Sequence, residues 1–114
     1  MKAKKPLYPD GVRVGRSSAG LGLFAVRPYK KGERIIEYVG CSLRTAEQYS
    51  SRSKYLFEVN SRKTIDGAMR SNIARYINHS CKPNCEPEIV RGRVFIDAIK
   101  SIKAGEEFVY DYGD

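Results

Sequence analysis

Turn signals recur so closely along this chain that only short secondary-structure elements fit between them. Glycine permits positive φ angles, and proline fixes φ and lacks a backbone donor, so both interrupt regular elements. Ten glycines and five prolines are spread along the 114 residues. The segments between them are rich in β-branched and aromatic residues, which favour strands. The sequence therefore predicts a mainly β domain of many short strands. We expect strands in residues 12–14, 34–40, 55–59, 86–90, 93–98 and 107–112, and a strand end with a turn at 64–67.

Only two stretches favour a helix. Thr45-Ala46-Glu47-Gln48 has the form of a capping box, in which a threonine hydroxyl accepts from the first free amides and a glutamine three residues on reaches back. A short helix over residues 45–51 is therefore expected. Residues 69–77 fit either a short helix or irregular turns, because their apolar side chains recur at helical spacing.

Residues 25–40 and 98–113 share one pattern. Each segment has a basic residue, a turn, a Gly-Glu pair and a closing glycine after an aromatic residue. At an offset of 73 residues, Gly32-Glu33 aligns with Gly105-Glu106. We expect one turn-plus-strand design used twice, as two similar β edges, because two copies are too few for a solenoid.

The length predicts one domain, preceded by a flexible basic segment. Residues 1–11 contain three lysines and two prolines, and residues 12–114 form the domain. No apolar run reaches the length of about 18 residues that a membrane span needs, so no membrane contact is expected. The basic start has no apolar stretch behind it, so no secretion signal is expected. With three cysteines, an odd number, we expect free thiols and an intracellular setting, either cytoplasm or nucleus.

The net charge of +8 comes from the N-terminal half. Residues 1–57 carry twelve Lys and Arg against four Asp and Glu, whereas residues 58–114 carry nine of each. Such a half can attract nucleic acid or an acidic partner surface. It can equally be a solvated basic face that keeps the protein soluble. No base-stacking or groove-reading motif decides between the two interpretations.

Residues 75–85 contain many of the side chains that could bind a metal or react. They hold the only histidine, His79, and two of the three cysteines. Cys81 and Cys85 are spaced like half of a zinc site, to which Cys41 could add a third ligand. A closed zinc site needs four ligands, and His79 would crowd Cys81 as the fourth. We therefore expect free thiols and no metal.

Six aromatic residues lie inside apolar strands or next to them. Singly, each is best explained as a core residue whose hydroxyl reaches a partner at the rim. Together they could line a narrow channel that suits the long apolar stem and amine of a lysine. These residues are Tyr38, Tyr55, Phe57, Tyr76, Tyr110 and Tyr112.

Over residues 12–114 the chain resembles the SET-domain protein lysine methyltransferases. The resemblance rests on Ala-Gly-Leu-Gly-Leu-Phe at 19–24, Glu-Tyr-Val-Gly at 37–40, Tyr-Leu-Phe at 55–57, Arg-Tyr-Ile-Asn-His-Ser-Cys at 75–81 and Gly-Glu-Glu-Phe-Val-Tyr-Asp-Tyr-Gly at 105–113, in that order. It implies a SET-domain, β-clip-like fold of several short sheets, in which the last motif threads under a preceding loop as a pseudoknot. It also implies S-adenosylmethionine as methyl donor on one face and a protein lysine entering from the opposite face.

Carried over by position, the resemblance implies a role for each motif. Tyr112 would be the catalytic tyrosine beside the transferring methyl group. Tyr38, Phe57 and Tyr110 would line the lysine channel, and Tyr55 would line it and contact the cofactor. The cofactor would also be bound by the backbone of Ala19, Gly20, Leu21 and Gly22 and by the backbone and side chains of Asn78 and His79.

The resemblance also implies a substrate and a product. The substrate would be a histone or another basic chromatin-type protein. Tyr110 occupies a position where tyrosine tends to limit methylation, because its hydroxyl can hold a water or the amine where another methyl must fit. Mainly monomethylation is therefore expected. The competing interpretations are a SET-like binding module with weak catalysis and a small basic nucleic-acid-associated domain.

Many members of that family carry a cysteine-rich segment after the SET domain. That segment binds zinc together with the cysteine of the Asn-His-Ser-Cys motif and closes the lysine channel. This chain ends at Asp114, so we expect no such lid. We expect the substrate or a second subunit, for instance in a homodimer, to complete the channel.

Overall fold

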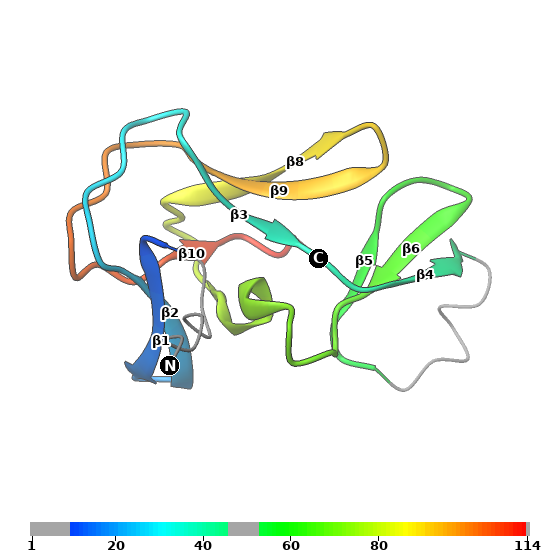
Figure 1. Cartoon of the computed structure of the whole chain (residues 1–114), viewed down its shortest axis with the longest axis horizontal. Coiled ribbons are helices and arrows are strands. Elements are labelled where there is room, and N and C mark those ends of the chain that lie inside the picture. Colours follow the sequence, from blue (N-terminus) through cyan, green and yellow to red (C-terminus); the bar gives the residue numbers. More distant parts are fainter. Residues whose placement is uncertain (1–9, 46–52, 114) are drawn as a thin grey trace, which may run out of the picture.

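The computed structural model describes residues 10–45 and 53–113, and ten short strands form four small sheets there (Figure 1). The sheets confirm the mainly β prediction, and one turn of 3-10 helix lies among the described residues. Of the expected helix over 45–51 only its first residue is described, and most of the expected flexible segment 1–11 also lies outside the described residues. The elements are β1 (Val12–Ser17) paired with β2 (Gly20–Ala25); β3 (Arg34–Tyr38), β9 (Arg93–Ala98) and β8 (Cys85–Val90) in that order; β4 (Cys41–Arg44), β6 (Lys63–Asp66) and β5 (Leu56–Glu58); β7 (Asn78–His79) paired with β10 (Val109–Tyr110); and the helical turn η2 (Ile73–Tyr76).

Local turn chemistry explains the elements that were predicted well. The β8–β9 hairpin is confirmed, and its turn residues Arg91 and Gly92 both have positive φ, 51° and 78°. The expected strand 34–40 instead ends at Tyr38, and β4 begins after Gly40, which was not predicted. A Cβ at Gly40 would clash with the carbonyl oxygen of Asp66, so this glycine lets the chain bend tightly against β6.

The predicted final strand 107–112 is wrong in extent, because different residues of this segment pair with different parts of the chain. Glu107 forms a bridge with Phe24, and only Val109–Tyr110 pairs, in parallel, with β7. The amide of Ser80 donates to the Tyr110 carbonyl, while the amide of Asn84 donates to the Val109 carbonyl, both at 3.1 Å. Residues 80–84 connect β7 to β8, so the chain end runs through this loop in the predicted pseudoknot.

The repeated pattern forms a pair of turns with local two-fold symmetry. Gly105 donates its amide to the Ala25 carbonyl at 2.8 Å, and Gly32 donates to the Ala98 carbonyl at 2.7 Å. Tyr29 and Ile102 exchange both backbone hydrogen bonds, at 2.8 and 2.9 Å. Each bond has its counterpart 73 residues away, so the two expected β edges pair with each other (Figure 1, cyan and orange).

The core joins this doubled turn to the sheets. Phe108 is fully buried, donates its amide to the Leu23 carbonyl at 2.8 Å and meets the Tyr29 ring edge-on at 5.4 Å between centroids. Burying an aromatic ring is worth several kcal/mol, so the threaded segment stabilises the fold as well as closing it. In the part of the chain that the structure describes, no helix has the length and apolar character to cross a membrane.

Candidate active site

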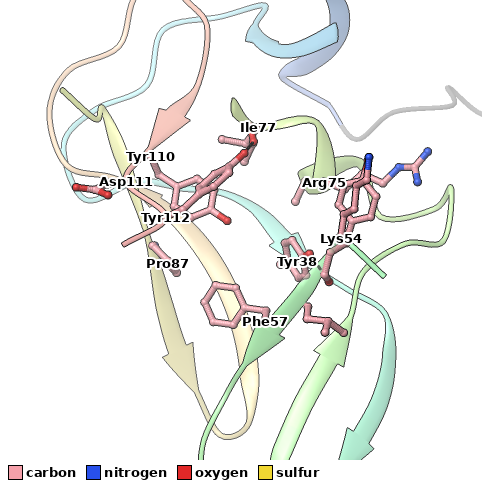
Figure 2. A pocket seen from close by; sticks show the side chains of 12 residues that line it. Tyr38, Lys54, Phe57, Arg75, Ile77, Pro87, Tyr110, Asp111 and Tyr112 are labelled. Carbon is pink, nitrogen blue, oxygen red and sulfur yellow. Dashed lines mark hydrogen bonds between the residues drawn. The ribbon is translucent and has the colours of Figure 1, made fainter. Parts of the chain in front are cut away.

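A cavity of about 420 Å³ lies between β5, the end of η2, β10 and the edge strand β8 (Figure 2). Tyr38 and Phe57 lie toward the same space as Tyr110 and Tyr112, and Pro87 of β8 lies between Phe57 and Tyr110. Aromatic side chains therefore supply most of the wall. The predicted channel residues, together with Tyr55, are brought together in this cavity.

Tyr38 forms a buried part of the wall. Its side chain is buried, its hydroxyl donates to the Tyr55 carbonyl at 2.8 Å, and its ring lies 5.6 Å from that of Phe57. Burial raises the pKa of Tyr38, because the phenolate form would lose its solvation. Buried Asn72 holds the chain beyond it by accepting from the Val39 amide at 3.0 Å. Tyr38 is thus a fixed, neutral wall residue.

Tyr110 and Tyr112 form the opposite side, with ring centroids 4.8 Å apart. Burial raises the pKa of Tyr110 to about 12. The Tyr112 side chain is 54% exposed, yet both its ends are held. Its hydroxyl donates to the Ile77 carbonyl, and its backbone amide donates to His79 Nδ1 at 3.1 Å. Burial raises the pKa of Tyr112 as well.

The contact with Tyr112 determines the tautomer of His79. A backbone amide can only donate, so Nδ1 must accept and the neutral ring carries its proton on Nε2. Nε2 lies 3.7 Å from Cys81 Sγ. Cys41 and Cys81 are exposed, Cys85 is buried, and all three are free thiols. Within residues 10–45 and 53–113 no group of three His, Cys, Asp or Glu side chains could hold a metal.

The predicted cofactor residues meet beyond Ile77 and Tyr112, next to β7. Asn78 Nδ2 donates to the Leu21 carbonyl at 2.9 Å, which joins the β1–β2 hairpin to β7. Gly20 has a φ of 107°, and a Cβ there would meet no protein atom within 4 Å. The backbone after Ala19 is therefore open to a ligand. The structure places residues 19–22, Asn78 and His79 in one region, and Tyr55 apart from them in the cavity wall.

Two charged residues of the motifs also lie at this site, although neither was predicted to act there. The guanidinium carbon of Arg75 lies 5.2 Å from the centroid of the Tyr55 ring and 5.0 Å from that of the Tyr76 ring. Arg75 is also among the residues that line the cavity (Figure 2). Glu107 accepts from Asn78 Nδ2 at 2.8 Å. One signal could have identified Glu107: the repeated pattern breaks there, because the equivalent position 73 residues earlier is Arg34.

The domain is built of short strands, and its threaded C-terminus places a tyrosine between an aromatic cavity and β7, which is hydrogen-bonded to a glycine-containing hairpin. This is the architecture of a SET domain. The SET domain sequence profile matches residues 20–113, and the chain belongs to this family.

Its similar relatives are named as histone methyltransferases. The chain is 40% identical over 124 residues to histone-lysine N-methyltransferase trr of Drosophila melanogaster, covering 97% of this chain and 5% of that protein. It is also 40% identical over 125 residues to the H3 lysine-4 specific histone-lysine N-methyltransferase of Kluyveromyces lactis, covering 97% and 12%. The chain thus spans a small part of the length of these relatives.

Solved structures with the same fold come from a fungal complex. Polycomb repressive complex 2 of Chaetomium thermophilum matches with a TM-score of 0.77 and 34% identity over 90% of this chain and 15% of that chain. The same complex in an autoinhibited conformation, bound to S-adenosylmethionine, matches with a TM-score of 0.75 and 34% identity, over 91% and 15%.

Proposed function

We propose that this domain transfers a methyl group from S-adenosylmethionine to a lysine side chain of a histone or another basic chromatin protein. The names of the relatives support the reaction class, and the ligand of the fungal complex supports the cofactor. One observation of this chain carries the proposal. Tyr112 lies between the aromatic cavity and the Asn78–His79 segment, and it contacts both.

The residues next to β7 fit S-adenosylmethionine. The backbone at Gly20 is open on its outer side, so an extended ligand can lie against it. Asn78 offers an amide oxygen, which suits the positive groups of this cofactor, because its Nδ2 donates to Glu107 and Leu21. When bound, the cofactor supplies an electrophilic methyl group on a sulfonium. We assign Ala19, Gly20, Leu21, Gly22, Asn78 and His79 to holding it.

The cavity provides what a lysine needs before it can react. Its amine has a pKa of about 10.4 in water, so nearly all of it is protonated at neutral pH. An aromatic wall disfavours the charged form by desolvation. Tyr38, Phe57 and Tyr110 would hold the neutral amine in line with the methyl group, and such positioning contributes much of the rate.

Tyr112 would orient the reactants and would not act as a base. Its hydroxyl proton is engaged by the Ile77 carbonyl, and its pKa is raised by burial. A phenol of this kind is a poor proton acceptor at neutral pH. Held at both ends, the ring can fix the position at which methyl donor and amine meet.

We further propose that the product is mainly monomethyllysine. Tyr110 lines the cavity, and among the described residues none forms a hydrogen bond with its hydroxyl. The hydroxyl is therefore available to hold a water or the amine where a second methyl would fit. Mass spectrometry of product peptides should show monomethylation, shifting to higher states in Tyr110→Phe. Tyr29→Phe, in the core away from the cavity, is the matched control. Chiefly trimethylated product from the unmutated protein would contradict this.

The main test joins binding and turnover. Calorimetry should detect S-adenosylmethionine binding, and incubation with a histone mixture should then give methylated lysine. No binding at millimolar cofactor would remove the proposal and leave the binding-module interpretation. A histone substrate would make the nucleus the site of action.

Two partner proposals accompany this function. The doubled turn places Lys30 and Lys31 on one turn and Lys103 on the other, a basic surface that suits nucleic acid. Salt-sensitive binding to duplex DNA would support it, and its absence at low salt would contradict it. The homodimer that would complete the cavity predicts a dimer in sedimentation, whereas a monomer with full activity would exclude it.

A further inference from the structure

We propose that Glu107 is a positioning residue that fixes the orientation of the Asn78 carboxamide in the cofactor site. The inference rests on the proposed function, because that function assigns Asn78 to the cofactor. Glu107 comes from the segment that threads through the loop of residues 80–84. Asn78 lies on β7, directly before that loop. A residue of the threaded segment would thus orient a side chain at the start of the loop that it passes through.

The hydrogen bonds around Asn78 allow only one orientation of its amide. Nδ2 donates to Glu107 Oε2 at 2.8 Å and to the Leu21 carbonyl at 2.9 Å, with a longer contact to the Ser17 hydroxyl at 3.4 Å. A carboxylate and a carbonyl can only accept. A flipped amide would therefore set its oxygen against two acceptors and lose both bonds. The amide oxygen, Oδ1, accepts from no donor among the described residues, so it is the face left for a ligand.

Glu107 is itself held in place by the β1–β2 hairpin. Its other oxygen, Oε1, accepts from the Ser17 hydroxyl at 2.9 Å. A Cβ at Gly22 would clash with Oε2, so the glycine provides the space in which the carboxylate lies. The described residues form no ion pair with this carboxylate within 4.0 Å. The carboxylate is therefore held by hydrogen bonds from uncharged groups, next to the proposed site for a cationic cofactor.

The same geometry explains why position 22 is a glycine, and this explanation differs from the predicted one. The resemblance implies that its backbone passes the cofactor. In the structure Gly22 is buried, and the atom nearest to its missing side chain belongs to Glu107. The glycine is thus required for the Glu107–Asn78 contact, whichever ligand lies outside it.

An exchange of hydrogen-bonding groups tests the proposal. Asn78→Asp sets a second carboxylate against Glu107, so the affinity for S-adenosylmethionine should fall by about ten-fold or more. Glu107→Gln in that background supplies an amide donor to the introduced carboxylate and should recover part of the loss. Alone, Glu107→Gln keeps an acceptor for Asn78 and should change the affinity by less than about three-fold, whereas Glu107→Ala should weaken it by about ten-fold.

Calorimetry provides the dissociation constants, and the unfolding temperature without cofactor reports the stability of each variant. Glu106→Ala is the matched control, because it removes a neighbouring exposed carboxylate that accepts from the Lys103 amide and leaves the contacts of Asn78 intact. It should bind the cofactor like the unmutated protein. Glu107→Ala binding normally, or no recovery in the Asn78→Asp, Glu107→Gln double variant, would overturn the proposal.

A measurement without cofactor separates this inference from the proposed function. In the ligand-free protein, nuclear magnetic resonance should show the Asn78 side-chain amide protons exchanging slowly with water, and faster in Glu107→Ala but not in Glu106→Ala. Unchanged exchange in Glu107→Ala would refute the Glu107 contact even if the cofactor binds. Protected amide protons in a protein that binds no cofactor would refute the proposed function and retain the contact.

Discussion

The two copies of the repeated segment, residues 25–40 and 98–113, are alike through their turns and differ in the paths that their chains take beyond them. After the first turn, the chain enters an open antiparallel sheet, and Arg34 and Glu37 form ion pairs on its surface, with Asp97 at 2.9 Å and Arg93 at 2.7 Å. After the second turn, the chain passes through the loop of residues 80–84. The equivalent positions hold Glu107 and Tyr110, which face the candidate site.

This comparison separates what builds the fold from what builds the site. The turns pair with each other through matched backbone bonds, which many sequences could form. Exposed ion pairs such as Arg93–Glu37 contribute little to stability because solvent screens them, so the first copy is a scaffold with a tolerant surface. In the second copy, the threaded segment brings the equivalent side chains against β7 and the cavity. The site therefore depends on the positions at which the two copies differ.

The largest effect is expected in the core, where Phe108 and Ile35 are equivalent residues. Phe108 is 0% exposed and Ile35 is 7% exposed. Phe108→Ala should cost about 3–5 kcal/mol of unfolding free energy, and Ile35→Ala about 2–3 kcal/mol, because the ring fills more space and anchors the threaded segment. Urea unfolding measures both. A larger loss of unfolding free energy for Ile35→Ala than for Phe108→Ala would contradict the anchoring role assigned to Phe108.

The next effect concerns the reaction and applies only to the second copy. Tyr112→Phe removes the hydroxyl that donates to the Ile77 carbonyl, so the ring is no longer held at that end. We expect methyl transfer to fall by about a hundred-fold. Calorimetric affinity for S-adenosylmethionine should stay within about three-fold, because the Tyr112 backbone contact with His79 remains.

The control for this prediction comes from the first copy, where the equivalent residue is Val39. Its side chain lies outside the cavity lining, so Val39→Ala should leave transfer per folded molecule unchanged. If Tyr112→Phe keeps full transfer, the orienting role assigned to its hydroxyl is wrong.

Burial of Tyr110 makes stability depend on alkaline pH. Its pKa is raised from 10 to about 12, so the unfolded chain loses the phenol proton first. The contribution of Tyr110 to the free energy of unfolding is fully present below pH 10 and is lost as the pH rises to about 12. Because the side chain is partly exposed, we expect a loss of about 1–2 kcal/mol. Tyr110→Phe should lack this part of the loss in urea titrations at several pH values. An unchanged pH dependence in that variant would show that the cavity does not desolvate Tyr110.

Local signals were enough to predict the parts of the fold that depend on neighbours in sequence. The Arg91-Gly92 turn identified the β8–β9 hairpin, and the Gly-Glu pairs identified the doubled turn. The break at Gly40 could not be predicted, because its cause is a carbonyl of Asp66 on another strand. The short extent of β10 could not be predicted for the same reason, since its pairing with β7 depends on the threading of the chain.

The candidate site likewise contains residues that the sequence could identify and one that it could not. Tyr110 and Tyr112 were found through the family resemblance, because periodicity alone would have placed them in a core. Glu107 lies beside them in sequence, but its role depends on Asn78 and Gly22, which reach it only in the folded chain. A residue that acts through another residue leaves little trace in a motif, except where a repeated pattern breaks.

The smallest effect tests the symmetry of the doubled turn. Gly32 and Gly105 have φ angles of 87° and 91°, and a Cβ at either would meet no atom within 4 Å. Replacement by alanine therefore costs only backbone strain, about 1–2 kcal/mol, and the two variants should lose the same stability. Chemical unfolding measures the difference between them, which should be within about 0.5 kcal/mol. A clearly larger loss for Gly105→Ala would mean that its turn also carries strain from the threaded segment, so that the copies differ before their strands begin.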